Sequence, residues 1–246
     1  MNDRIRFFEE IAANGHVALN VRLYDGWLMR FSNGFTGRGN SISILYPSTK
    51  PIEEKVSYCE ECYVKQGLPA NFKLTDGDED FSDFLANRGY QVVTPTDLMV
   101  LDNLSSVDDK SLFADCVFCD IPDEWLPFYF EYENITSEKN RETFRQMLSK
   151  VQVQTIYCSV FHEGKVVACA GIAIEQGYAL IQYVIVSEAM RGKGFGEKLC
   201  RAIIAKAKEC GARHAYLQVV QTNEIAKNLY KKLGFKKEYT YWYMKK

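Results

Sequence analysis

The stretch VIVSEAMRGKGFGEKLCRAIIAKAKECG, residues 184–211, decides the fold of the second half of the chain. An apolar, β-branched run leads into three glycines at alternate positions beside Arg191 and Lys193, and an amphipathic helical pattern follows. A glycine-rich turn between a strand and a helix N-terminus presents unpaired backbone N–H groups and the positive end of the helix dipole. The stretch therefore predicts a binding site for a phosphate group.

Apolar periodicity predicts strands and helices through the rest of the chain. The first half reads as helix 2–13, strands 20–31 and 40–46, helix 51–66, strand 71–75, helix 79–88 and strand 90–101. The second half reads as a strand near 112–118, two helices within 121–150, strands 153–161, 165–175 and 178–187, a helix after the glycines, strand 213–220, helix 223–233 and strand 236–244. Helices interleaved with strands predict an α+β fold in layers. A polar Ser/Asp-rich stretch, 102–110, predicts a linker between two domains.

The same order of elements occurs twice. Gly67 follows a helix in the first half as Gly211 does in the second, and FLANRGY at 84–90 corresponds to LYKKLGF at 229–235. The pattern favours a duplication. The alternative is that two unrelated segments of this kind both end their helices with glycine, which is a common helix terminator.

Composition narrows the class of protein. The chain has 246 residues, 47% of them hydrophobic and 25% charged, with a formal net charge of -2. A general nucleic-acid binder usually has a basic excess, so we expect no nucleic-acid partner. The first fifteen residues lack the order of a secretory signal, and the longest apolar run, 166–174, is too short to span a bilayer. We expect a cytoplasmic protein without a membrane partner.

Eight cysteines in a chain without an export signal are expected to be free thiols. Two CxxC pairs, Cys59 with Cys62 and Cys116 with Cys119, leave a tetrathiolate zinc site open. Cys59 and Cys62 lie within a helical pattern and not on a turn, which favours buried, inert thiols. We therefore predict no metal.

Two common phosphate-binding motifs are absent around the glycines. No Lys-Ser/Thr follows them, which disfavours a nucleotide triphosphatase. The third glycine of a dinucleotide fingerprint would fall at Glu197, which disfavours nicotinamide cofactors.

The motifs resemble those of a known family. Arg191-x-x-Gly194-x-Gly196 after Val184-Ile185-Val186, with Asn223-x-x-Ala226-x-x-Leu229-Tyr230-x-x-x-Gly234-Phe235 downstream, resembles the GNAT superfamily of acyl-CoA-dependent N-acyltransferases. The resemblance covers about 112–246 and implies a catalytic domain at 111–246. The segment 1–104 lacks both motifs and, by the repeat, resembles a degenerate GNAT-like lobe. The implied fold is a mixed, mostly antiparallel sheet flanked by helices, in two related lobes.

The resemblance also implies roles for individual residues, with acetyl-CoA or coenzyme A as the cofactor. Tyr230 would be the general acid that protonates the departing thiolate, and the side-chain amide of Asn223 would contact the cofactor. The strand residues Val184, Ile185 and Val186 would pair with the pantetheine arm. The backbone of one continuous run would bind the pyrophosphate: Arg191, Gly192, Lys193, Gly194, Phe195 and Gly196.

Acyl transfer to an amine needs a proton donor, an oxyanion site and a base. A Tyr hydroxyl, with a pKa of ~10, lies close enough to a thiol near ~8.5 to donate its proton. A strand N–H around 184–186 would hold the oxyanion. Many family members carry a Glu where Gln182 and Tyr183 stand here, so the base is left open between water, Glu133 and Glu175.

A covalent cysteine intermediate on Cys158 or Cys169 is the alternative mechanism, although no His has a spacing that suggests activation. His162 and His214 are expected at the surface.

The acceptor site is expected near the helices of 121–150, whose aromatic residues are either core or pocket lining: Trp125, Phe128, Tyr129, Phe130 and Tyr132. In SNGFTGRGNS, 32–41, Asn33-Gly34 indicates a hairpin turn, and Arg38 is a candidate for holding an acceptor carboxylate.

The sequence thus predicts transfer of an acetyl group from acetyl-CoA to an amine of a small molecule or peptide. The alternative is a non-catalytic acyl-CoA sensor. Monomer and homodimer both stay open.

Overall fold

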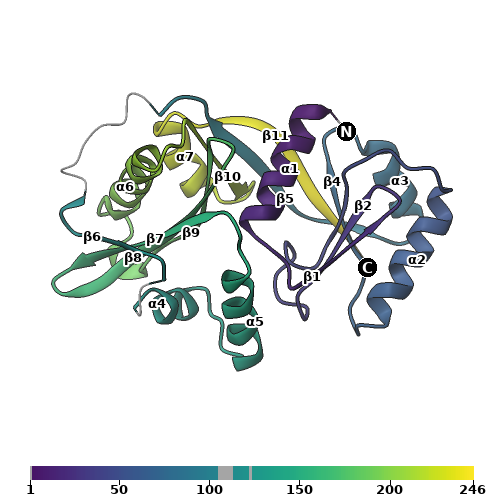
Figure 1. Ribbon diagram of the computed structural model, residues 1–246, viewed down its shortest axis with the longest axis horizontal. Coiled ribbons are helices and arrows are strands. Elements are labelled where there is room, and N and C mark those ends of the chain that lie inside the picture. The colour runs from purple at the N-terminus through teal and green to yellow at the C-terminus, as the bar shows by residue number, and fades with distance from the viewer. Residues whose placement is uncertain (1, 105–112, 122–123) are drawn as a thin grey trace. The chain divides into compact units, whose positions relative to one another are not determined.

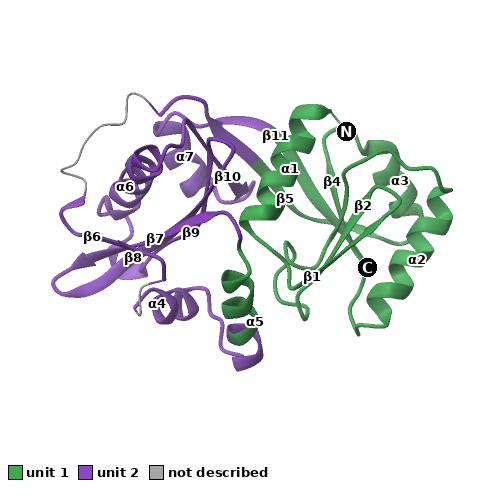
Figure 2. Ribbon diagram, in the orientation of Figure 1, with its two compact units in different colours: residues 1–97, 142–151, 239–246 green, residues 98–141, 152–238 purple. Residues whose placement is uncertain are grey.

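The computed structural model describes residues 2–104, 113–121 and 124–246 (Figure 1). The chain forms two compact units (Figure 2). Unit 1 contains residues 1–97, 142–151 and 239–246, and unit 2 contains residues 98–141 and 152–238. Unit 1 therefore consists of three segments that are separate in the sequence. The domain limits 1–104 and 111–246 stay a prediction.

Among the described residues, unit 1 contains a sheet, three complete helices and residues 142–149 of a fourth helix, α5 (Glu138–Ser149). Its elements are α1 (Asp3–Gly15), β1 (Asn20–Tyr24), β2 (Trp27–Phe31), β3 (Ile42–Ile44), α2 (Ile52–Val64), β4 (Asn71–Thr75) and α3 (Glu79–Asn87). β5 (Gln91–Leu101) and β11 (Lys236–Lys245) each have residues in both units. Its strands are ordered β1-β2-β3-β4-β11. β3 and β4 run parallel, as expected for strands joined through a helix, and the other pairs are antiparallel.

The predicted strand 20–31 is wrong: the segment is a hairpin of β1 and β2. Asp25 and Gly26 form its turn with φ of 43° and 84°. Asp-Gly is a strong signal for such a two-residue turn, in which both residues need positive φ. A Cβ on Gly26 would lie 2.5 Å from the Tyr46 carbonyl oxygen, so the turn also lies close to the following backbone.

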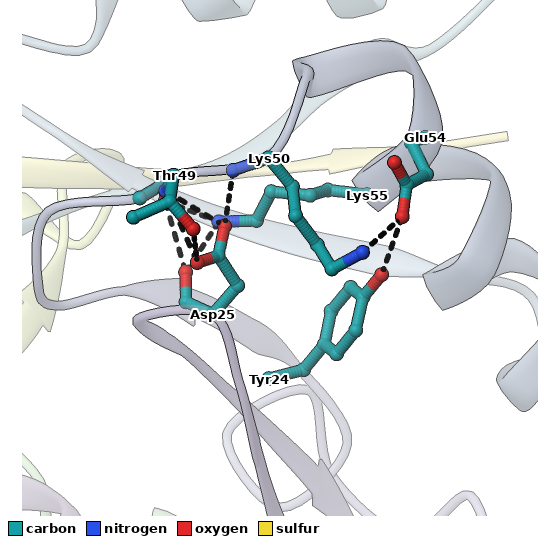
Figure 3. A network of polar contacts seen from close by, with 7 residues as sticks. Tyr24, Asp25, Thr49, Lys50, Glu54 and Lys55 are labelled. Carbon is teal, nitrogen blue, oxygen red and sulfur yellow. Dashed lines mark hydrogen bonds and ion pairs between the residues drawn. The ribbon is translucent and has the colours of Figure 1, made fainter.

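The Asp25 carboxylate fastens this turn to the start of α2 (Figure 3). It accepts hydrogen bonds of 3.0 Å from the backbone N–H groups of Thr49 and Lys50, and the Thr49 hydroxyl donates at 2.8 Å. Lys55, whose side chain is buried, lies 3.2 Å from the carboxylate and 4.0 Å from the Trp27 ring centroid. The N–H donors are the largest cause of the lowered pKa of Asp25.

The two faces of this sheet differ in character. One face packs against α2 and α3 through buried apolar side chains that include Trp27, Phe72, Val56 and Leu85. α1 lies on the other face, where Glu9 contacts Lys73 and Tyr239 (Figure 1). Successive strand residues point to opposite faces, so one strand supplies both layers.

Unit 2 is built on an antiparallel meander. Its elements are β6 (Cys116–Cys119), α4 (Trp125–Tyr132), the start of α5 (Glu138–Ser149), β7 (Gln154–His162), β8 (Lys165–Glu175), β9 (Tyr178–Val186), the 3-10 turn η2 (Glu188–Met190), α6 (Phe195–Glu209), β10 (His214–Val220) and α7 (Glu224–Lys232). The strands are ordered β10-β9-β8-β7-β6, and only the β9–β10 pair among them is parallel.

Helices cover both faces of this meander. Leu199, Ile203 and Ile204 of α6 are almost fully buried against one face. Burying a side chain of this size contributes ~1.5–3 kcal/mol, so α6 is fixed firmly to β7, β8 and β9. α4 lies on the other face (Figure 1). There, Trp125 of α4 packs against Tyr157 and Tyr183.

The predicted α+β fold with a mostly antiparallel sheet is confirmed. The expected hairpin turn at 162–164 is present, with φ of 51° at Glu163 and 75° at Gly164. The order α2-β4-α3-β5 matches α6-β10-α7-β11, and Gly67 and Gly211 both have positive φ. A common origin of the two segments stays a prediction.

Two further expectations concern a strand and the linker. The strand predicted near 112–118 is β6, and residues 105–110 of the predicted linker lie outside the described residues. Among the helices that the structure describes, none has both the length and the apolar character needed to cross a membrane.

Candidate functional site

A bulge interrupts the pairing of β8 and β9. Cys169 lies opposite Ile185 and Gly171 lies opposite Gln182, so β9 has one residue more than β8 in this interval. Tyr183 takes up the extra length with a φ of 59°, which an L-residue with a large side chain rarely adopts. Opposite the bulge, the Ala170 carbonyl oxygen accepts a hydrogen bond of 3.1 Å from the Trp125 indole N–H. The bulge thus releases backbone groups from the β-ladder.

β9 and β10 pair over only part of their lengths. The parallel register runs from Tyr178 opposite His214 to Ile181 opposite Leu217. Five residues of β9, 182–186, and three of β10, 218–220, continue beyond that register. This stretch of β9 includes the bulge and the predicted residues Val184, Ile185 and Val186. Its edge toward β10 is therefore where an extended chain could add to the sheet.

The glycine loop leads directly from this end of β9 into α6. Gly192 and Gly194 have φ of 75° and 86°, and a Cβ on either would meet no atom within 4 Å. Gly194 is the N-cap of α6 and provides no side-chain cap. The first-turn N–H groups of an α-helix have no acceptor within the helix. The loop therefore offers open space, uncapped donors and the positive end of a fifteen-residue helix.

Charged side chains surround the loop without closing it. Arg191 is largely exposed, and its Nε donates to the Val186 carbonyl oxygen at 3.3 Å. Lys193 is exposed. Glu197, in the first turn of α6, could compete for the helix N-terminus, but it is paired with Arg201 at 2.9 Å and with Lys232 at 2.5 Å. These contacts, with the Lys232 contact first, lower the pKa of Glu197.

Phe195 and Gly196 hold the start of α6 in place. The half-buried Phe195 ring lies 5.2 Å from the His162 ring. A Cβ on Gly196 would lie 3.4 Å from a Leu229 methyl and 3.6 Å from a Val186 methyl, so β9, α6 and α7 meet closely there. The sequence-predicted loop residues thus lie together at the end of β9.

α7 carries the two remaining predicted residues. Asn223 is the N-cap of α7, and its Oδ1 accepts the Ala226 N–H at 3.1 Å, which leaves its NH₂ group for other contacts. Tyr230 is 7% exposed and packs in the core beside Cys200 and Phe235. Burial raises the pKa of the Tyr230 hydroxyl above its usual range, so the phenol is protonated near neutral pH.

Comparison with known proteins identifies this arrangement. Residues 119–235 match the model of the acetyltransferase (GNAT) family. This segment is a GNAT acetyltransferase domain. Its limits contain the bulge, the glycine loop, Asn223 and Tyr230, and proteins of the family use acyl-CoA.

Relatives extend over almost the whole chain. The uncharacterized N-acetyltransferase YobR of Bacillus subtilis (strain 168) is 25% identical over 237 residues, 95% of each chain. The structure of a GCN5-related N-acetyltransferase from Kribbella flavida superposes with a TM-score of 0.69 at 15% identity and covers 98% of this chain and 94% of that chain. A conserved protein of unknown function from Staphylococcus epidermidis ATCC 12228 gives a TM-score of 0.68 at 14% identity, with 97% and 96% covered. The fold is therefore shared beyond the GNAT domain.

The two candidate bases lie at different places in the GNAT domain. Glu175 is opposite Tyr178, at the end of β8 and β9 far from the bulge. Six residue steps along β9 lead from 178 to 184, and ~3.3 Å per step gives a distance of roughly 20 Å. Glu133 is the C-cap of α4. Burial raises the pKa of Cys169, the charge of Glu133 raises it further, and the Cys169 thiol lies 3.8 Å from the Tyr183 carbonyl oxygen. Glu133 is thus the carboxylate nearer the bulge.

The two candidate cysteine nucleophiles, Cys158 and Cys169, are poorly suited to that role. Cys158 and Cys169 are fully buried, and their pKa values are raised. A hydrogen bond with Cys116 is the largest cause for Cys158, and burial is the cause for Cys169. Thiolates are the reactive form, so both thiols are poor nucleophiles.

Cys59 and Cys62 lie in α2 of unit 1, and burial raises the pKa of Cys59 to about 12. Across residues 2–104, 113–121 and 124–246, no three His, Cys, Asp or Glu side chains lie so that they could hold a metal ion.

His162 and His214 were both expected at the surface, and only His162 is exposed. The His162 side chain is 45% exposed. His214 is half-buried, because its ring stacks on Tyr178 with centroids 4.4 Å apart.

The aromatic residues of α4 are mostly core. Trp125 stacks on Tyr129 with centroids 5.0 Å apart, and both rings meet Tyr183 edge-on. Phe128 and Phe130 are also buried, and Tyr132 is half-buried. Their packing holds Tyr183, which the sequence interpretation did not place at a bulge. Gly171, a lone glycine inside a strand pattern, was a signal for it.

Proposed function

We propose that this protein transfers an acetyl group from acetyl-CoA to an amine of a small molecule or peptide. The observation that carries the proposal is the uncapped N-terminal turn of α6, reached through Gly192 and Gly194 directly from the free end of β9. Backbone donors, a helix dipole and two nearby cations suit a pyrophosphate. Acetyl-CoA would supply the thioester that is transferred.

Two parts of coenzyme A, the pyrophosphate and the pantetheine arm, would find binding groups among these residues. The N–H groups of residues 191–196 would bind the pyrophosphate, with Arg191 and Lys193 adding positive charge. Both side chains are exposed, so their share would weaken with salt. Val184 to Val186 would hydrogen-bond the pantetheine arm along the edge that β10 leaves after Leu217. The Asn223 NH₂ group would contact the cofactor from α7.

The bulge would place the reacting carbonyl group. Backbone N–H groups that a bulge releases from the ladder are fixed donors, and they need no reorganisation when charge develops on oxygen. Removing one such donor in an enzyme typically costs about 10²–10³ in rate. Tyr183, packed by Trp125 and Tyr129, would keep the donor aligned.

Two side chains would move protons. Tyr230, protonated because burial raises its pKa, would donate to the departing sulfur. Its raised pKa makes it a weaker acid than an ordinary phenol, but it keeps the proton in place at any physiological pH. Glu133 would accept a proton from the amine, directly or through water. Glu175, at the end of β8 opposite Tyr178, would lie too far from the bulge to do so.

All eight cysteines are free thiols. Free thiols persist in a reducing compartment, so we propose the cytoplasm as the site of action.

The test is a thiol-release assay with acetyl-CoA and a panel of amines: small amines, amino acids, aminoglycosides and peptides with free N-termini. The expected result is release of coenzyme A that depends on both substrates, with the acetylated amine seen by mass spectrometry. Calorimetry measures coenzyme A binding in parallel. Binding without turnover on any amine would make the protein an acyl-CoA sensor, and absence of binding would overturn the proposal.

A further inference from the structure

One face of the sheet in unit 1 is buried but carries polar side chains. Buried faces of this kind are normally apolar. Its residues come from β2, β4 and β11, which are adjacent to or near each other in the sheet, and from the loop 32–41. α1 covers this face, and Phe8 and Ile11 of α1 are almost fully buried. The buried polar residues are Arg30, Ser32, Asn71, Lys73, Thr75, Tyr239, Tyr241 and Tyr243.

Positive charge dominates the charged groups on this face. Glu9 of α1 pairs with Lys73 at 2.6 Å and accepts the Tyr239 hydroxyl at 2.7 Å. Burial lowers the pKa of Lys73 even with that ion pair, and burial lowers the pKa of Arg30 to about 10. The half-buried Arg38 lowers both values further. The positive charges of Arg30, Lys73 and Arg38 therefore lie close enough to influence one another, and burial of like charges is costly.

The Arg30 guanidinium is only partly satisfied. It is 7% exposed, and among the described residues its one hydrogen bond goes to the His16 carbonyl oxygen. A guanidinium has five N–H donors in a fixed planar fork. Donors therefore remain on a fully charged side chain that water hardly reaches.

The Tyr243 hydroxyl is the second incomplete group. Tyr243 is 6% exposed, and within the described residues its buried hydroxyl has no hydrogen-bond partner. The Tyr241 ring is 5.7 Å away. Burial raises the pKa of Tyr243 and the Tyr241 phenol raises it further, but the two hydroxyls do not meet in ordinary hydrogen-bond geometry. A buried hydroxyl without a partner destabilises a fold, so its presence calls for an explanation.

The loop 32–41 lies over the same place. A Cβ on Gly37 would be 3.7 Å from the Asn71 amide nitrogen and 3.7 Å from Tyr243 Cζ. The loop is held in shape by the Asn40 side chain, which accepts from the Ser32 N–H at 2.7 Å and donates to the Phe35 carbonyl oxygen at 2.7 Å. An ordered loop thus carries Arg38 to the side of Tyr243 and Arg30.

We propose that unit 1 binds the carboxylate of a small organic acid or amino acid on this face, with Arg30, Arg38 and Tyr243 as hydrogen-bond donors. The planar guanidinium fork matches the two oxygens of a carboxylate, and a phenol adds a third donor. The bound anion would add negative charge beside these cations and would accept a hydrogen bond from the Tyr243 hydroxyl. The site belongs to unit 1 alone, and it does not depend on acetyl transfer.

The experiment measures ligand binding to the full chain. Isothermal calorimetry and thermal unfolding are recorded with acetate, succinate, citrate, L-glutamate and inorganic phosphate, up to about 10 mM, a range that saturates millimolar sites. Sodium chloride at equal ionic strength is the reference. The expected result is saturable binding of at least one carboxylate, with a rise in Tm. No carboxylate binding, or equal binding of phosphate, would overturn the proposal.

Two variants and one control locate the site. Arg38→Gln and Tyr243→Phe should each weaken carboxylate binding by about tenfold or more, since a hydrogen bond to a charged group is lost. Arg88→Gln, which changes an Arg of α3 paired with Glu60, should stay within about twofold.

Tyr243→Phe also separates binding from packing. Without ligand its Tm should be unchanged or higher, because an unpartnered hydroxyl is removed and the ring stays. A fall in ligand-free Tm with unchanged carboxylate affinity would show a purely structural tyrosine and overturn the assignment.

Discussion

Gly171 of β8 lies against the ring of Tyr183 at the β9 bulge: a Cβ at position 171 would come within 3.0 Å of Tyr183 Cδ2. The Tyr157 ring is equally close, at 3.1 Å. The absence of a side chain at 171 therefore makes room for the two rings that support the bulge. Both rings are buried and packed against Trp125, so they have little freedom to move away.

Gly171→Ala should disturb the bulge. We expect a loss of stability of about 1–3 kcal/mol from overpacking, together with a fall in kcat, because Tyr183 adjoins Val184. Thermal unfolding and the acetyl-transfer assay measure the two effects. Gly37→Ala is the control, because its Cβ would make ordinary contacts of 3.7 Å and its φ is not positive. Equal stability of the two variants would contradict the packing argument.

Gly194→Ala should weaken acetyl-CoA binding. The left-handed backbone costs an L-residue about 1–2 kcal/mol, and the new methyl group would point into the space proposed for the pyrophosphate. Gly67→Ala is a matched control, because Gly67 has a φ of 68° and equally open surroundings after α2. Both variants should lose similar stability, but only Gly194→Ala should raise the Kd for coenzyme A. A similar Kd in both would remove the loop from the binding site.

Tyr230→Phe should reduce kcat by about 10²–10³, in the range typical for loss of a general acid, and should leave the Kd for coenzyme A within about twofold. Tyr178→Phe, at the other end of β9, serves as the control and should retain activity. If Tyr230→Phe kept full turnover, the proton would have to come from another donor.

Glu133→Gln should lower kcat by on the order of 10² if Glu133 is the base, whereas Glu175→Gln should have little effect. Rates measured across a pH series also separate the roles, because loss of the base should remove the limb of the profile that belongs to it. The opposite ranking of the two variants would mean that the amine enters from the other end of β9.

Asp25→Asn should destabilise unit 1 in a pH-dependent way. The folded-state pKa of Asp25 is lowered, chiefly by the Lys50 N–H, so its contribution is complete above the unfolded value of ~3.9 and is lost as the pH falls through the lower folded value. The difference in Tm from wild type should therefore be large at pH 7 and shrink below about pH 4. Asp83→Asn, exposed on α3, should show no such trend. A constant difference for Asp25→Asn would exclude the carboxylate charge as the cause.

Local sequence patterns were sufficient for most elements and for the glycine loop. β4 and β8 have the predicted limits, and the loop residues 191–196 gather at the end of β9 as the motif indicated. Such features follow from periodicity and from glycines with positive φ, which nearby residues determine. The Asp25-Gly26 turn signal is equally local. It was missed because the strand pattern on both sides of the turn led to the prediction of one continuous strand.

Other features depend on residues far apart in sequence. The bulge at Tyr183 needs Gly171 and Tyr157 on neighbouring strands, and the choice of Glu133 over Glu175 needs the β8–β9 register. The charge of Lys73 is balanced by Glu9, which precedes it by more than sixty residues. No single stretch carries this information, so the sequence left the base and the polar face undetermined.

The pairing of β11 with β4 has a consequence for synthesis of the chain. Tyr241 lies opposite Thr75 and Tyr243 opposite Lys73, so the ribosome makes the β4 side of this ladder long before the β11 side. Until β11 has been made, the nascent polypeptide has an open β4 edge, which favours association with other chains. A truncation that removes β11 would leave that edge permanently exposed.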